Sequence, residues 1–215
     1  MTRTALSDTA FGVQSIARTA VDNEREFGDH DSVVGDGDFG FSLARGFEIV
    51  LSDWDGLDRS SPSAFLKRVA LVISGRIGGT SGPLWGTAFL RAAAAVSGKE
   101  ELTGADVVAI LRASAEGIKS RGKSDLGDKT LLDALVPAMD ALEAELATAS
   151  GPAAALARMA RVARASADAT SLLQARRGRA IYTGERSIGS PDPGAVAVAV
   201  ILERLSREWA SRDDL

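Results

Sequence analysis

Apolar residues recur at helical spacing along nearly the whole chain, and no segment alternates in the manner of a β-strand. The clearest stripe consists of Leu131, Leu132, Leu135, Met139, Leu142 and Leu146. Val33-Val34 is too short for a strand, and the apolar run 195–202 follows a helix cap and continues into a charged amphipathic segment. The spacing therefore predicts an all-α protein, because a stripe with this period is buried when the chain is helical.

The same spacing divides the chain into eight expected helices. They cover approximately 5–27, 39–54, 65–73, 83–97, 107–118, 131–146, a segment that starts after Gly151-Pro152 and includes 156–162, and 193–212. The connections are short except 174–191, which is rich in Arg, Gly and Ser and is the candidate mobile loop. No linker or repeat separates a second unit, so residues 1–215 are expected to form a single domain.

Composition and charge argue against several classes of protein. The formal net charge of −4 is unsuited to nucleic acid, whose phosphates require clustered Lys and Arg. The absence of cysteine excludes disulfides and thiolate metal sites. The first residues lack the apolar core of a signal peptide, and no apolar run reaches the length of a membrane span. We expect a cytoplasmic protein with neither a nucleic-acid nor a membrane partner.

Residues 35–40 read GDGDFG and match the dinucleotide-binding pattern G-x-G-x-x-G. That pattern is informative only between a strand and a helix, and no strand is expected here. The surrounding stretch carries Asp31, Asp36 and Asp38, with Asp29 just before. Bare carboxylates repel phosphate, but Mg²⁺ held by carboxylates attracts it. The stretch thus predicts phosphate binding through a metal; a solvated turn that caps the next helix is the alternative.

A second glycine-rich stretch, GRIGGTSGPLWGT, covers residues 75–87. Its central residues are Gly78, Gly79, Thr80, Ser81 and Gly82, and Pro83 is a favourable first helical residue. Free N–H groups at a helix N-terminus and small hydroxyls form an anion site. The alternative is a tight turn between two helices.

Two further stretches are rich in glycine and charge. Residues 122–130, GKSDLGDKT, fail the Walker A pattern because Asp128 separates Gly127 from Lys129; they remain a candidate helix start near a nucleotide or a capping turn. Residues 176–194 carry four arginines, Arg176, Arg177, Arg179 and Arg186. They form either a loop that closes over phosphate or a solvated basic loop.

Taken in order, four of these segments resemble the nucleotide-binding L subunit of dihydroxyacetone kinases. The segments are DSVVGDGDFG (31–40), GGTSGPLWGTAFLRA (78–92), GDKTLLDALVPA (127–138) and GRAIYTGERSIGSPDPGA (178–195). The resemblance extends from about residue 10 to residue 205. It implies an eight-helix up-and-down barrel with the nucleotide site at one end, where ADP or ATP binds through Mg²⁺.

The resemblance also implies roles for individual residues. The metal ligands of the family match Asp31, Asp36 and Asp38. The nucleotide-binding positions match Gly78, Gly79, Thr80, Ser81 and Gly82 at the phosphates, Thr130 and Leu131 near the adenine, and Asp192, Pro193 and Gly194 in the turn that caps the pocket. Arg179 matches the arginine in the loop that faces the partner subunit, where it would stabilise the transferring phosphoryl group.

Two positions depart from the family pattern. Phe39 stands where the family usually has His, and Ser42 where it usually has Asn. Both family positions lie close to the phosphate end of the nucleotide, and a phenylalanine side chain neither donates a hydrogen bond nor binds a metal. The departures leave the three carboxylates unchanged, so they bear on the sugar and the phosphoryl donor rather than on nucleotide binding.

The family divides its labour between two chains. A separate K subunit holds the ketose, and the L subunit brings the nucleotide whose phosphoryl group passes to a terminal hydroxyl. The donor is either ATP as an exchanging substrate or an ADP that stays bound and is rephosphorylated by a phosphotransferase-system protein. A homodimer or hetero-oligomer is expected. The alternatives are a kinase for another short ketose, such as a tetrulose, and a non-catalytic nucleotide-sensing module.

Overall fold

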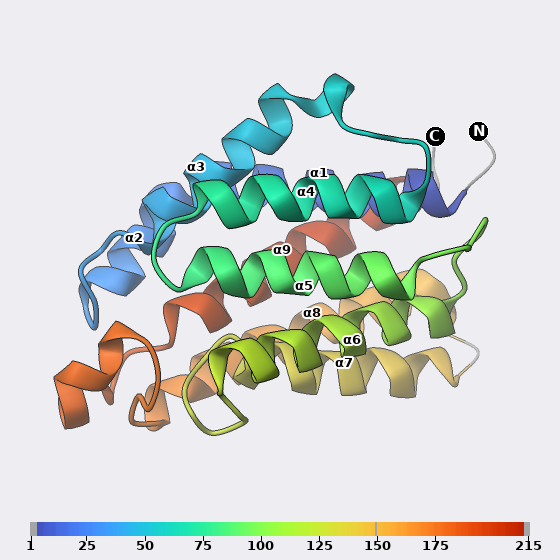
Figure 1. Cartoon of the computed structure of the whole chain (residues 1–215). Coiled ribbons are helices and arrows are strands. Elements are labelled where there is room, and N and C mark those ends of the chain that lie inside the picture. The colour runs from blue at the N-terminus through green and yellow to red at the C-terminus, as the bar shows by residue number, and fades with distance from the viewer. Residues whose placement is uncertain (1–3, 149, 213–215) are drawn as a thin grey trace.

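The computed structural model describes residues 4–148 and 150–212, and their regular structure is entirely helical (Figure 1). The α-helices are α1 (Ala5–Asp22), α2 (Glu24–Ser32), α3 (Phe39–Ser52), α4 (Pro62–Arg76), α5 (Ser81–Ala95), α6 (Gly104–Gly122), α7 (Leu132–Leu146), α8 (Gly151–Ala169) and α9 (Pro193–Arg212). Three 3₁₀ segments join them: η1 (Trp54–Gly56), η2 (Thr170–Leu172) and η3 (Arg179–Ser187). The prediction of an all-α fold is confirmed.

The long helices form a closed ring. Each packs on the next in the order α1, α3, α4, α5, α6, α7, α8, α9, and α9 packs on α1 to close it (Figure 1). The short α2 continues from α1 and packs on α3 and α9. Helices that follow one another in the chain are therefore neighbours in space, as short connections favour. The expected count of eight is close, since α2 is the additional helix.

The additional helix results from a break at Asn23. Its backbone leaves the helical region (φ −112°, ψ 20°), and its side-chain amide donates to the carbonyl of Thr19, 2.8 Å away. Asparagine competes in this way with the helical hydrogen bonds of the backbone. The expected helix 5–27 therefore ends at Asp22, and α2 carries the chain on to Ser32. Only Phe27 is buried in α2, so the spacing of apolar residues does not predict this helix.

Two clusters of buried side chains fill the interior. The first lies between α1, α3, α4 and α5 and includes Phe47 and Phe65; the second lies between α6, α7, α8 and α9 and includes Met139 and Met159. The helix α9 contributes to both, because successive residues from Ala195 to Leu202 face different sides and are nearly all buried. Small alanines on these faces allow the helices to approach closely.

The end of the ring where α1 begins is also where α9 ends. Arg212 donates to the Asp8 carboxylate at 2.8 Å, and its guanidinium lies 4.6 Å from the centre of the Phe11 ring. The ion pair and the cation–π contact join the first and last helices at this end. Within the described residues, no helix is both long and apolar enough to span a membrane.

Gly40 is required for the close approach of α2 and α3. A Cβ at this position would overlap the carbonyl oxygen of Glu24 and lie 2.6 Å from the amide nitrogen of Gly28, both backbone atoms. Gly40→Ala is therefore expected to lower the free energy of unfolding by about 1–3 kcal/mol, the usual cost of overpacking. Urea unfolding followed by circular dichroism measures this change.

Gly12→Ala in α1 is the matched control, because a Cβ there meets no atom within 4 Å. This substitution is expected to raise stability by about 0.5–1 kcal/mol, since alanine is the better helix former. Equal stability of the Gly40→Ala variant and the wild-type chain would contradict the packing of α2 on α3.

Candidate functional site

One end of the ring holds a cavity of about 460 Å³. In an up-and-down ring every second connection returns to the same end, so the α2–α3, α4–α5, α6–α7 and α8–α9 connections meet there (Figure 1). The sequence-predicted residues that line the cavity are Asp31, Asp36, Asp38, Gly78, Gly79, Thr80, Ser81, Thr130, Leu131, Arg179, Asp192, Pro193 and Gly194. The ring thus brings together four segments that are far apart in the sequence.

Gly82 is the one sequence-predicted site residue that does not line the cavity. It is buried in the first turn of α5, where a Cβ would overlap the carbonyl oxygen of Ile77. The position permits close packing of the glycine turn on the end of α4.

Three carboxylates gather at one side of the cavity. Asp31 lies near the end of α2, and Asp36 and Asp38 lie in the connection to α3; one oxygen of each is within 4.8 Å of the others. The backbone N–H of Phe39 donates to Asp31 at 3.3 Å and steadies its carboxylate. Asp31 is partly buried and the other two are exposed. This all-oxygen, negatively charged set suits a hard divalent cation such as Mg²⁺.

Arg179 extends from η3 over the same carboxylates. Its guanidinium contacts Asp36 and lies 3.0 Å from a carboxylate oxygen of Asp38. The side chains of this group are about half exposed, at 51%, so the ion pairs are open to water and to exchange of partners. Arg179 therefore places a positive charge beside the carboxylates, and burial does not fix the position of its side chain.

The glycine turn lies next to Arg179. Gly79 has a positive φ of 63°, which favours glycine, and its Cβ position is 3.7 Å from the Arg179 guanidinium. The turn leads into α5, whose N-cap residue Thr80 makes no side-chain capping hydrogen bond. The first N–H groups of α5 therefore have no capping side chain and point towards the cavity end, as in helix-terminal anion sites.

Apolar side chains also line the cavity, and we call this group the apolar wall. Its members are Leu84, Trp85, Ile118, Leu131 and Pro193. Such side chains can pack against a flat ring. Sequence reasoning missed Leu84, Trp85 and Ile118 as site residues, because each belongs to a helical segment and the pattern does not say which residues border a cavity.

Two aspartates shape the turns that begin α7 and α9. The Asp133 carboxylate accepts hydrogen bonds from the backbone N–H groups of Gly127 (2.5 Å) and Thr130 (2.7 Å). The Asp192 carboxylate accepts from the N–H of Ala195 at 2.8 Å. Loss of contact with water raises the pKa of Asp192 to about 7; the Ala195 bond opposes the shift and the nearby charge of Asp133 adds to it.

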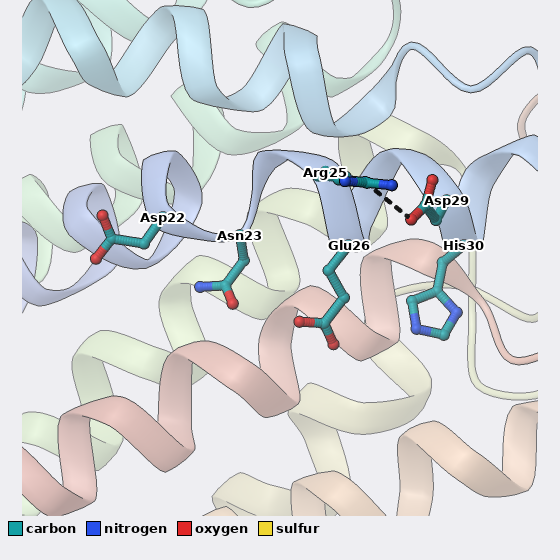
Figure 2. Close-up of a pocket in the computed structure, with 6 residues that line it drawn as sticks. All are labelled: Asp22, Asn23, Arg25, Glu26, Asp29 and His30. Carbon is teal, nitrogen blue, oxygen red and sulfur yellow. Dashed lines mark ion pairs between the residues drawn. The ribbon is translucent and has the colours of Figure 1, made fainter.

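A separate hollow of about 630 Å³ lies beside the junction of α1 and α2. Figure 2 shows Glu26 and His30 projecting from the same side of α2, and Arg25 pairing with Asp29 at 3.9 Å. That pair is almost fully exposed, so it contributes little to stability. The hollow contains the single histidine of the chain but none of the sequence-predicted site residues.

Comparisons with known proteins agree on one family. A family model described as the DAK2 domain matches residues 33–207. The ADP-binding subunit DhaL of a PEP-dependent dihydroxyacetone kinase from Escherichia coli (strain K12) is 37% identical over 176 residues, which are 82% of this chain and 84% of the relative. L-erythrulose 1-kinase from Mycolicibacterium smegmatis is 39% identical over 202 residues, 90% of this chain and 34% of that protein.

A solved structure has the same fold. The dihydroxyacetone kinase of C. freundii in complex with AMP-PNP and Mg²⁺ superposes with a TM-score of 0.74 and 26% identity, over 94% of this chain and 34% of that chain. The chain therefore spans about a third of the longer kinases that it matches, and most of the length of the separate subunit.

The raised pKa of Asp192 predicts how stability depends on pH. Because the pKa is about 7 in the folded chain and near 3.8 ordinarily, the folded state binds more protons between these values. The free energy of unfolding is expected to fall as pH rises from about 4 to about 7. The fall is expected to be on the order of 2 kcal/mol, less than the whole pKa shift corresponds to, because Asp192 is partly exposed and water screens its charge.

Asp192→Asn is expected to remove this pH dependence, because the amide oxygen keeps the Ala195 hydrogen bond without a titrating proton. Asp55→Asn, at an exposed position in η1, is the control that should leave it unchanged. Urea unfolding at several pH values gives the comparison, and an Asp192→Asn profile parallel to that of the wild type would contradict the assignment.

Proposed function

Because this chain belongs to the DAK2 domain family, we propose that it is the nucleotide-binding subunit of a dihydroxyacetone-type kinase. It binds ADP or ATP with Mg²⁺, and the phosphoryl group passes to a terminal hydroxyl of a short ketose held by a partner K subunit. The observation that carries the proposal is the meeting of the acidic side chains, the glycine turn and Arg179 at one cavity. The relatives named as ADP-binding subunits are similar over most of the chain.

Asp31, Asp36 and Asp38 would hold the metal. Their oxygens are close enough to share one ion or to divide between two, and carboxylate ligands match the preference of Mg²⁺. When bound, Mg²⁺ neutralises charge on the phosphates and on the group being transferred. The backbone N–H of Phe39 keeps Asp31 oriented towards the cluster.

The glycine turn and Arg179 would act on the phosphates. Gly78, Gly79, Thr80 and Ser81 present N–H and hydroxyl groups at the start of α5. Arg179 lies beside both the turn and the carboxylates, so its guanidinium would stabilise the charge of the phosphoryl group as it leaves the nucleotide. Arg179 is the catalytic residue in this scheme, and no base of this chain deprotonates the sugar.

The base of the nucleotide would lie against the apolar wall. Thr130 and Leu131 form one side, and the turn Asp192, Pro193 and Gly194 forms the other. The two segments lie close together at this edge, because a Cβ added at Gly194 would come within 3.2 Å of the Cβ of Leu131. A glycine at this position therefore keeps the edge of the pocket open.

The two departures from the family pattern lie at the phosphate end. The Phe39 ring packs on Phe27, with centroids 6.3 Å apart, and Ser42 lines the cavity beside Gly78. Phe39 thus supports the cluster by packing and by its backbone N–H, and not through a polar side chain. Two L-erythrulose kinases are among the relatives, at 39% and 37% identity, which favours a four-carbon ketose as the second candidate substrate.

The partner would dock around the mouth of the cavity. Tyr182 is 87% exposed and Leu172 is 79% exposed, and Ile181 and Ile188 add apolar surface on the same loop. The chain carries a single histidine, His30, which does not line the cavity, so we assign the holding of the ketose to the partner. The donor would be free ATP or a phosphotransferase-system protein that rephosphorylates bound ADP.

Nucleotide binding is tested with the metal site. Asp36→Asn and Asp38→Asn are each expected to weaken Mg-ADP binding by at least about 100-fold, because each removes a charged ligand. The free energy of unfolding is expected to change by less than about 1 kcal/mol, since both carboxylates are exposed. Isothermal titration with Mg-ADP gives the affinity and urea unfolding gives the stability.

Glu48→Gln on α3 provides the control, because this carboxylate pairs with Arg45 and does not line the cavity. It should bind Mg-ADP as the wild type does. Unaltered binding by Asp36→Asn and Asp38→Asn would refute the metal assignment, and unfolding of either variant would favour a capping role instead.

Transfer is tested by a coupled assay with a K subunit, dihydroxyacetone or L-erythrulose, and either ATP or the phosphotransferase proteins as donor. Tyr182→Ser is expected to raise the KM for the K subunit about tenfold and to leave Mg-ADP affinity unchanged, because the ring is exposed outside the cavity. Phe41→Ser, an exposed aromatic on α3, is a comparison variant for lost apolar surface. Absence of turnover with every donor and ketose would favour the nucleotide-sensing alternative.

A further inference from the structure

The ammonium group of Lys129 is enclosed by backbone carbonyls. The residue is 2% exposed, although it borders the cavity. Its Nζ donates to the carbonyl oxygens of Thr170 (2.8 Å), Leu173 (3.1 Å), Ser187 (2.8 Å) and Ser190 (2.6 Å). An ammonium has three protons, so these four acceptors use all of them and leave none for a ligand.

This arrangement resembles the binding of an ion by backbone oxygens. Within the described part of the chain, Lys129 forms no ion pair with a carboxylate, and its charge is stabilised by the four carbonyl dipoles. Loss of water lowers the pKa of Lys129, and the charge of Asp192 opposes the shift. The backbone of Lys129 is left-handed (φ 62°), a conformation that non-glycine residues keep only where other contacts enforce it.

The four carbonyls belong to one long connection. Thr170 and Leu173 precede residues 174–186, here called the Arg179 segment, and Ser187 and Ser190 follow it. Ser190 is also two residues before Asp192. Lys129 therefore fastens both ends of the Arg179 segment to the start of α7, and the same bonds fix the approach to the turn that begins α9.

A second set of bonds reinforces this attachment. The carbonyl of Asp128 accepts from the N–H of Arg176 at 3.0 Å, and its carboxylate pairs with Arg177 at 3.1 Å. Ser187 also accepts at its hydroxyl from the N–H of Ala175, 2.9 Å away. The segment is thus held through its backbone and Arg177, while the Arg179 side chain lies at the cavity and stays about half exposed.

We propose that Lys129 is a positioning residue, a fixed internal cation that holds the Arg179 segment and the Asp192–Gly194 turn against the cavity. It does not bind phosphate, unlike the lysine of a Walker A loop, which its surroundings in the sequence superficially resemble. The consequence for catalysis rests on the proposed function of Arg179 and of this turn. The attachment itself is a property of the chain without nucleotide.

Hydrogen exchange on the chain without nucleotide tests the attachment first. Lys129→Met, which keeps the length of the side chain and removes its charge, is expected to speed exchange of the Ala175, Arg176 and Gly189 amides at least tenfold. Amides of α4 should be unchanged. Lys123→Met is the matched control, because Lys123 is also left-handed but exposed. Unchanged exchange of the three loop amides would overturn the proposal.

Nucleotide affinities then separate positioning from phosphate binding. The comparison is made in an Arg179→Ala background, where any loss that acts through Arg179 has already occurred. If Lys129 acts by positioning, adding Lys129→Met there weakens Mg-ADP and AMP by factors that agree within about threefold, because both contact the same turn. If Lys129 binds the terminal phosphate, the preference of this background for ADP over AMP falls at least tenfold, and the proposal is overturned. A wild-type chain that binds no nucleotide refutes the proposed function, while the exchange result still decides the attachment.

The absence of cysteine allows a chemical rescue. The Lys129→Cys chain is alkylated while unfolded and is then refolded. Alkylation with 2-bromoethylamine restores an ammonium group at nearly the length of lysine. Alkylation with 1-bromopropane gives a neutral group of similar size. The ammonium form is expected to recover the wild-type exchange rates and, with the K subunit, the wild-type kcat. Recovery by the propyl form to the same extent would overturn the proposal.

A measurement on the wild-type chain covers the case in which neither altered chain folds. The ¹⁵N signal of Lys129 Nζ, assigned through its own side-chain carbons, is expected to show slowly exchanging protons and to stay in place when Mg-ADP is added. Loss of the protection, or a shift that follows the phosphate of the ligand, would overturn the proposal.

Discussion

Closure of the ring by α9 is the constraint on which the rest of the structure depends. This helix packs on α1 and α8 and supplies buried residues to both clusters of the core. Because the ring is closed with antiparallel neighbours, alternate connections must meet at one end. The cavity is therefore a product of helix order and not of any single motif, and α9 begins at its edge with Pro193, directly after Asp192.

Charge is sorted across the cavity in a way that suits a metal nucleotide. Carboxylates gather on the α2–α3 side, the N-terminus of α5 presents N–H groups beside them, and Arg179 lies above both. The apolar wall lines another part of the same cavity. Anionic phosphate and a flat base thus find separate surroundings within one hollow, which is consistent with the ADP-binding names of the relatives and with the AMP-PNP and Mg²⁺ of the solved neighbour.

Sequence reasoning predicted the all-α class, most helix positions and the segments that meet at the cavity, because apolar periodicity and glycine turns are local signals. It missed the break at Asn23, since α2 buries only Phe27 and so has almost no stripe. It also missed the hydrogen bonds of Lys129. The four acceptors are backbone carbonyls more than forty residues away, and the pattern of side chains along the sequence does not reveal them. The metal and nucleotide roles of the site residues remain predictions, because they depend on a bound ligand.

The Arg212–Asp8 pair joins the first and last helices at the end opposite the cavity. Additional polypeptide attached to the start of α1 or the end of α9 would therefore extend from the end of the ring opposite the cavity and would not cover the cavity. The same module is thus equally suited to act as a separate subunit or to be tethered within a larger enzyme. Both arrangements occur among its relatives, of which some are matched over 84% of their length and others over 34%.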